Sequence, residues 1–248
     1  MENKKIVLKR ILTALVATML VFSQSVFAEG EMLVPVGKTV GISVFKNEGF
    51  TESGIGTMTF YEPESLMFGA LGHGICDEKN NLIQINGGEV LKAEIVSIKR
   101  GEKGSPGELI GVFTESESML GEIEKNSDKG VYGKLLRKDE LERPPLPTAK
   151  RDEVHEGEAT ILSDAGEDEV SEYEVEIIKI NKNESDNRGM IVKVTDSNLI
   201  EKTGGIVRGM SGSPIIQNGK LVGAITHVFV GDPNCGYAIF IENMLSAI

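Results

Sequence analysis

Short apolar segments recur along the chain and are separated by turns rich in Gly, Pro, Asn and Asp. Apolar Tyr173, Val175 and Ile177 alternate with three glutamates, which predicts a half-buried strand with one face in water. Strands at regular spacing with little helix are typical of a sandwich or a barrel. Helix is predicted only as one turn over 197–202 and a short C-terminal helix over 241–248. The predicted strands cover 54–61, 68–71, 82–85, 89–99, 110–113, 121–124, 131–135, 158–162, 173–177, 190–194, 215–216, 221–230 and 237–240.

Turn signals divide the pattern into two lobes. Asn86-Gly87-Gly88 and Asn218-Gly219 predict tight turns between strands. Residues 141–150 contain three prolines and are expected to be extended and stiff, as a linker would be. The sequence therefore predicts one lobe over about 54–140 and another over 151–248. Residues 29–53 are predicted to be an extended N-terminal segment.

The N-terminus has the pattern of an export signal. Four basic residues precede the apolar run Ile11–Phe22, and Val26-Phe27-Ala28 offers small residues at a cleavage position. This run is shorter than the ~20 residues that cross a bilayer. We expect residues 1–28 to be a signal peptide, with a retained membrane anchor as the alternative. The protein would then act outside the cytoplasmic membrane and close to it.

Charge and cysteine content narrow the classes of function. The 248 residues carry a formal net charge of −12 and no basic tract, which argues against nucleic-acid binding. Cys76 and Cys235 are too few to form a disulfide framework, and we expect both thiols to be free. No CxxC or HxxxH spacing is present. The sequence therefore predicts no metal site and no cofactor.

Ser211 lies in a glycine frame of the form Gly-x-Ser-Gly-x-Pro, which runs from Gly209 to Pro214. Glycines on both sides allow a sharp turn that would leave the hydroxyl clear and let a substrate approach closely. In such a turn the N–H groups of Gly209 and Ser211 would form an oxyanion hole for an acyl-transfer intermediate. A structural turn with an incidental serine is the other interpretation, because short motifs also match by chance.

A nucleophilic serine needs a base, and the chain has three histidines. His73 has glycine on both sides and follows a predicted strand, so its side chain can face a cleft. His155 lies in a charged segment and is expected to be exposed. His227 lies within a predicted strand, where a structural role is more usual. On the residues alone, His73 is the leading candidate and the other two remain open.

Two regions resemble the SpoIVB family of sporulation serine peptidases. The first contains Ile55–Pro63 and Gly69–His73, and the second runs from Gly204 to Pro233. The resemblance extends over most of residues 54–248. It implies a trypsin-like peptidase with two β-barrels and a triad of His73 as base, Asp196 as orienting acid and Ser211 as nucleophile. Gly223, Ala224, Ile225 and Thr226 resemble the strand that holds substrate by strand addition.

The chain also departs from these families in two ways. Trypsin-like enzymes usually take the acid from the first lobe, whereas Asp196 lies shortly before Ser211. Asp77, close to His73, is the alternative acid, although a turn residue is its simpler interpretation. Founding members of the SpoIVB family carry a PDZ module before the peptidase. The stretch between Ala28 and Gly54 is too short for one, so docking through that module is not carried over.

The resemblance implies an exported serine endopeptidase that acts in the space between mother cell and forespore. Its expected substrates are itself and a membrane-anchored regulator of an intramembrane protease. A non-catalytic extracytoplasmic binding or scaffold protein with a peptidase fold is the alternative. A redox or metal role for Cys76 is a third possibility, against which a small buried apolar role is favoured.

Overall fold

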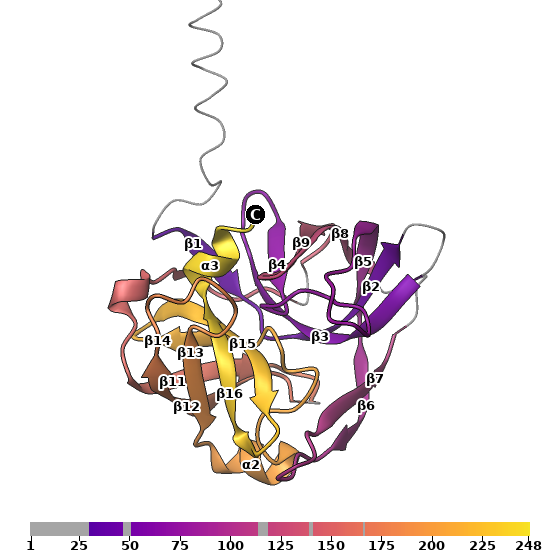
Figure 1. Ribbon diagram of the computed structural model, residues 1–248. Helices are drawn as coiled ribbons and strands as arrows, with labels where there is room; N and C mark the ends of the chain where they lie inside the picture. The colour runs from indigo at the N-terminus through magenta and orange to yellow at the C-terminus, as the bar shows by residue number, and fades with distance from the viewer. Residues whose placement is uncertain (1–29, 47–50, 114–118, 139–140, 166) are drawn as a thin grey trace, which may run out of the picture.

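The computed structural model describes residues 30–46, 51–113, 119–138, 141–165 and 167–248. The predicted signal peptide over residues 1–28 lies outside the described residues. The described chain forms two antiparallel six-stranded barrels (Figure 1), which confirms the predicted mainly β, two-barrel fold. Within the described ranges, no helix combines the length and apolar character needed to cross a bilayer.

The first barrel closes in the order β3–β2–β5–β8–β9–β4, because β4 also pairs with β3. A short strand, β1, extends this sheet beyond β3 and pairs with β10 from the linker. The bounds of these strands are β1 Met32–Pro35, β2 Thr39–Lys46, β3 Thr51–Tyr61, β4 Met67–Ala70, β5 Ile85–Lys92, β8 Met119–Ser127, β9 Gly130–Leu135 and β10 Leu146–Pro147.

The second barrel closes in the order β11–β12–β13–β16–β15–β14. Its strands are β11 Gly157–Ser163, β12 Ser171–Ile180, β13 Met190–Val194, β14 Pro214–Gln217, β15 Lys220–Phe229 and β16 Asp232–Phe240. A 3₁₀ turn, η2 (Arg151–Glu153), precedes it, and the predicted helices are present as α2 (Ser197–Thr203) and α3 (Ile241–Leu245). Each barrel encloses its own apolar core, with Val40 and Phe68 in the first and Ile161 and Val192 in the second.

A third apolar cluster joins the barrels beneath α3. Phe60 of the first barrel, Leu221 and Ile239 of the second and Met244 of α3 are all buried in it. Burying apolar surface between the barrels holds their facing loops in a fixed relationship. The loops that carry candidate chemistry approach each other along this junction.

Two predictions are wrong, namely the separate N-terminal segment over 29–53 and the turn at Asn86-Gly87-Gly88. The segment 29–53 is not a separate extension, because β2 pairs with both β3 and β5 and is a strand of the first barrel. The segment was predicted to be extended, and it is, but Val40, Ile42 and Val44 are buried in the barrel core. The Asn86-Gly87-Gly88 segment is not a turn, since β5 continues through it. A Cβ on Gly88 would lie 2.4 Å from the carbonyl oxygen of Ser43, so this glycine allows two strands to approach closely.

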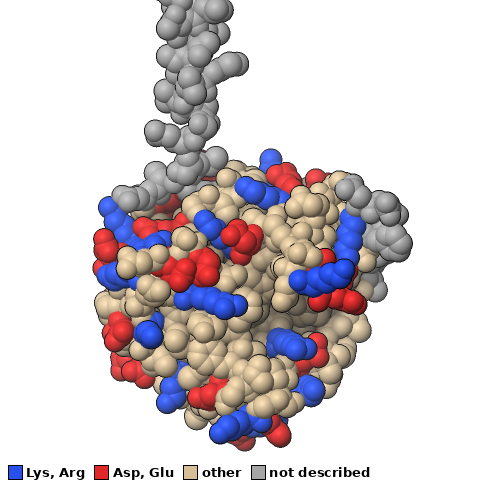
Figure 2. Space-filling model, in the orientation of Figure 1, with Lys and Arg blue, Asp and Glu red and all other residues tan. Residues whose placement is uncertain are grey.

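The charged side chains of both signs are mixed over the face shown in Figure 2, and no broad basic area is seen on it.

Candidate active site

The loop that carries Ser211 follows α2 and is shaped by two glycines. Gly209 has φ +98° and Gly212 has φ +99°, in the region that favours glycine. A Cβ on Gly212 would lie 2.1 Å from the carbonyl oxygen of Thr57, so a larger residue would push the barrels apart. The predicted glycine frame therefore fits the serine loop against the first barrel.

Hydrogen bonds hold the serine loop against β15. Gly212 N donates to the carbonyl oxygen of Ile225 at 2.7 Å, and Ile225 N donates to that of Ser213 at 3.0 Å. The Ser211 hydroxyl donates to the carbonyl oxygen of Thr226 at 2.6 Å. Ser211 is half-buried, so its hydroxyl can be reached from outside, although it is hydrogen-bonded to a backbone oxygen. This hydroxyl must leave the Thr226 oxygen before a base can take its proton.

His73 follows β4 in a sharp turn, in which Leu71 and Gly72 both have positive φ. Its Nδ1 lies 2.9 Å from the carbonyl oxygen of Gly74. Because a carbonyl can only accept, Nδ1 carries the proton and Nε2 has the free lone pair. Burial lowers the pKa of His73, and the bond to Gly74 raises it by a smaller amount. The neutral imidazole is thus favoured, as a general base requires.

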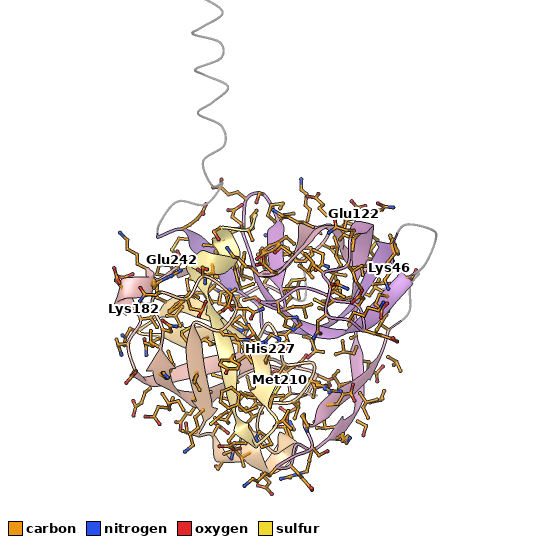
Figure 3. The ribbon with its side chains drawn as sticks, in the orientation of Figure 1. Lys46, Glu122, Lys182, Met210, His227 and Glu242 are labelled. Atoms are coloured by element: carbon orange, nitrogen blue, oxygen red, sulfur yellow. The ribbon has the colours of Figure 1, made fainter. Side chains whose placement is uncertain are left out.

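His227 packs on His73. The centroids of the two rings lie 4.9 Å apart, and the ring planes are tilted by 36°. Figure 3 labels His227 and Met210, the residue before Ser211, near the junction of the two barrels. Burial, the neighbouring His73 and Arg188 lower the pKa of His227 to about 4. Its buried Nδ1 has no hydrogen-bond partner among the described residues.

A cavity of about 350 Å³ contains the predicted base and nucleophile together. His73 of the first barrel and Ser211 and Gly209 of the second all line it. Its other lining residues are Ile42, Glu52, Ser53, Gly54, Ile55, Leu71, Ile75, Cys76 and Arg208. The cavity is therefore built by both barrels, and Glu52 and Arg208 line it together with His73 and four aliphatic side chains.

The N–H groups of Gly209 and Ser211 donate no hydrogen bond within the described part of the chain. The neighbouring carbonyls are occupied, because Thr57 donates from Oγ1 to Gly209 at 2.7 Å and from N to Ser211 at 2.9 Å. Two free donors on one glycine-framed turn are the components of an oxyanion hole. The contribution of Thr57 was missed, since no sequence pattern distinguishes this threonine from others in a strand.

The structure does not bring Asp196 to His73. Asp196 is the N-cap of α2, where its carboxylate accepts from Leu199 N at 2.9 Å and from Glu174 N at 3.4 Å. Figure 1 shows α2 at the lower end of the second barrel, away from the junction of the barrels. A side chain that caps a helix accounts for an aspartate at this position without catalysis. The group that orients His73 is instead the Gly74 carbonyl.

The predicted substrate strand needs a correction of a few residues. Gly223 and Ala224 pair with β14 on one side and with β16 on the other, and Ile225 is bonded to the serine loop. These residues have no free edge for a peptide. Beyond Thr226, β15 pairs only with β16 in the described part of the chain. The edge at His227–Phe229 is therefore the one that can accept a strand.

The remaining candidates lie in other roles. His155 is exposed, and its ring contacts Asn218 at 2.9 Å. Asp77 accepts hydrogen bonds from the backbone of Lys79 and Asn81, as a turn residue does. Cys76 and Cys235 are both free, as predicted, but Cys76 is exposed, so the buried apolar role expected for it is wrong. Among the residues that the structure describes, no group of three or more His, Cys, Asp or Glu side chains could hold a metal ion.

Comparison with known proteins gives a family. A sequence profile of the SpoIVB peptidase S55 family matches residues 39–245, which is most of the chain. This range includes β2, in agreement with its place in the first barrel. No curated protein matches the chain.

Several solved protease structures are similar at low identity. The Rv3671c protease from M. tuberculosis in its active form is 15% identical, with 86% of this chain and 79% of that chain covered and a TM-score of 0.46. The HtrA-type protease AlgW with a tripeptide is 13% identical, with 86% and 59% covered and a TM-score of 0.47. Deg5 is 12% identical, with 86% and 88% covered and a TM-score of 0.42.

Proposed function

Because this chain belongs to the SpoIVB peptidase S55 family, we propose that it is an exported serine endopeptidase of sporulation signalling. The observation that carries this proposal is that His73 and Ser211, from different barrels, line one cavity together with Gly209. A base, a nucleophile and two free N–H donors are the minimum for acyl transfer by serine.

The reaction begins when a substrate enters and the Ser211 hydroxyl turns from the Thr226 oxygen towards His73. Nε2 of His73 takes the hydroxyl proton as the oxygen attacks the peptide carbonyl. The oxyanion that forms accepts hydrogen bonds from Gly209 N and Ser211 N. The C–N bond then breaks, and His73 gives its proton to the leaving amine. Water hydrolyses the acyl-enzyme by the same steps, with His73 again acting as base.

The acyl half of the substrate pairs with the open edge of β15. Residues His227–Phe229 offer backbone groups there, next to the Thr226 carbonyl that holds the resting hydroxyl. Strand addition gives affinity through main-chain bonds with little dependence on side chains. The amine half leaves past His73 into the cavity, whose apolar wall includes Ile42, Ile55 and Ile75.

The compartment in this proposal rests on the N-terminal sequence, and the substrate rests on the resemblance to the SpoIVB family. The export pattern over residues 1–28 directs the chain out of the cytoplasm, and retention of that segment would keep the enzyme at the membrane. We therefore propose that it cleaves a membrane-anchored regulator of an intramembrane protease, and itself, between mother cell and forespore.

A non-catalytic scaffold is the second candidate. Two observations favour it: the Ser211 hydroxyl rests on Thr226, and the Asp196 carboxylate caps a helix. A scaffold, however, does not account for the two free N–H donors on the serine loop. The two functions differ in whether Ser211 reacts.

The peptidase and the scaffold are distinguished by testing the purified protein for peptide hydrolysis and for self-cleavage, with mass spectrometry as the readout. We expect Ser211→Ala to abolish both activities. Ser213→Ala is the matched control, because Ser213 lies in the same loop and its buried hydroxyl has no partner among the described residues. Hydrolysis that persists in Ser211→Ala would contradict the peptidase assignment.

A further inference from the structure

A two-stranded ribbon connects the first barrel to the serine loop. It consists of β6 (Glu94–Lys99) and β7 (Glu108–Val112), inserted between β5 and β8. Figure 1 shows the ribbon extending from the first barrel along the side of the second. Its inner side chains Ile95, Ile98 and Leu109 pack against the core of the second barrel. The ribbon is therefore held in place by apolar contacts with the barrel that carries Ser211.

The first residue of β7, Glu108, forms a parallel bridge with Arg208, which lies three positions before Ser211. Arg208 N donates to the carbonyl oxygen of Gly107 at 2.9 Å, and Leu109 N donates to the carbonyl oxygen of Arg208 at 2.8 Å. Leu109 is buried, so water does not compete for this bond. The orientation of the Arg208 carbonyl is thus set by a strand outside both barrels.

This bond also fixes the direction of the Gly209 N–H. In a planar trans peptide the C=O and the following N–H point in opposite directions. Because the Arg208 carbonyl faces Leu109, the Gly209 N–H faces away from the ribbon. If this peptide rotated, a carbonyl oxygen would replace a donor in the oxyanion hole. Glycine at 209 has the backbone freedom for such a rotation, so the peptide needs an external restraint.

We propose that the β6–β7 ribbon positions the Gly209 donor of the oxyanion hole, with the Leu109 N–H as the positioning group for the Arg208–Gly209 peptide. This proposal rests on the peptidase function proposed above. The ribbon contributes no atom to the reaction; it acts through the direction of one peptide group. Contact between the Leu109 side chain and Gly209 is a separate effect, because a Cβ at 209 would lie 3.0 Å from it.

Two substitutions at one position separate the N–H from the side chain. Leu109→Pro removes the N–H, and it breaks no bond between β6 and β7, because this N–H points at Arg208. Leu109→Ala keeps the N–H and removes most of the side chain. We expect Leu109→Pro to lower kcat by about 10² to 10³ with KM nearly unchanged, which is the loss expected for one oxyanion donor. Leu109→Ala is expected to keep kcat within about fivefold while lowering thermal stability.

The outcomes distinguish this proposal from the peptidase function. If wild type cleaves peptides and Leu109→Pro keeps its kcat, the positioning role is wrong and the function remains. An equal loss of kcat in both variants would also overturn it, because packing would then be responsible. If the wild type shows no hydrolysis, crystal structures of the wild type and of Leu109→Pro test the positioning role directly. The Arg208 carbonyl should face residue 109 in the wild type and should turn away from it in Leu109→Pro. If Leu109→Pro does not fold, an amide-to-ester replacement at Leu109 removes the same N–H, and unchanged kcat and carbonyl direction would refute the role.

Discussion

Thr57 in the first barrel donates a 2.7 Å hydrogen bond from its hydroxyl to the carbonyl oxygen of Gly209 in the second. Its backbone N–H bonds the Ser211 carbonyl, and its own carbonyl accepts from Leu71, two residues before His73. Thr57 is fully buried. One residue therefore connects the histidine turn to the serine loop, and the distance between the proposed base and the proposed nucleophile depends on it.

Replacing Thr57 tests this connection. Thr57→Val leaves the Gly209 carbonyl without its donor, which should cost about 1–3 kcal/mol of stability. Since the serine loop is then less restrained, kcat should fall by about tenfold or more. Thr57→Ser keeps the hydroxyl and should recover most of both losses. Chemical denaturation and steady-state kinetics measure the two effects, and equal activity in Thr57→Val and wild type would contradict the connection.

Substitutions of Asp196 separate helix capping from catalysis. Asparagine is also a good N-cap, so Asp196→Asn should keep both stability and activity, whereas Asp196→Ala should lose about 1 kcal/mol of stability. Neither variant should lose much kcat per folded molecule. A fall of about 10⁴-fold in Asp196→Asn, as for the acid of a serine triad, would show that Asp196 reaches His73 during the reaction.

The pH dependence of activity reports the protonation of His73. Burial lowers the pKa of His73 below its ordinary value of 6.5, so the imidazole stays neutral at a lower pH than usual. The acidic limb of kcat/KM should therefore have its midpoint below 6.5, since the free enzyme's base sets that limb. His155→Ala should leave the midpoint unchanged. A midpoint above 7 in the wild type would be inconsistent with a half-buried base that has no carboxylate partner among the described residues.

The pH dependence of stability reports His227. Its pKa is about 4 in the folded protein, against an ordinary value of 6.5. Between these values the unfolded chain binds more protons, so stability is lost as the pH falls from 6.5 towards 4. His227→Gln cannot titrate and should lose less stability over this range. Urea denaturation at several pH values measures the difference, and parallel curves for both proteins would contradict the low pKa.

Local sequence signals predicted the elements of the site that depend on a few neighbouring residues. The glycines around Ser211 and the turn before His73 need backbone angles that few other residues adopt, so they are visible in the sequence. The alternation of apolar residues likewise indicated most of the strands and the mainly β fold, although 82–84 lie outside any strand and the predicted strand 89–99 is divided between β5 and β6. Both short helices were predicted, although α3 ends at Leu245 and not at 248.

Features set by strand pairing could not be predicted. β15 has a free edge only beyond Thr226, because β14 begins at Pro214 and pairs no further along β15 than Ala224, and nothing local specifies where that pairing ends. Asp196 directly precedes a helix, which suits a helix cap, and it lies shortly before Ser211, which suits the acid of a triad. Only the tertiary fold distinguishes these two roles. The bond from Leu109 to Arg208 joins residues distant in the chain, which a single sequence does not reveal.

The most direct test of the central claim, that His73 activates Ser211, is covalent labelling with a fluorophosphonate followed by mass spectrometry. The folded wild type should gain one adduct, mapped to Ser211, and His155→Ala should label at the same rate. His73→Ala should label far more slowly, because the hydroxyl then has no base to take its proton. An adduct at another residue, no adduct on folded wild type, or an unchanged labelling rate in His73→Ala would contradict the claim.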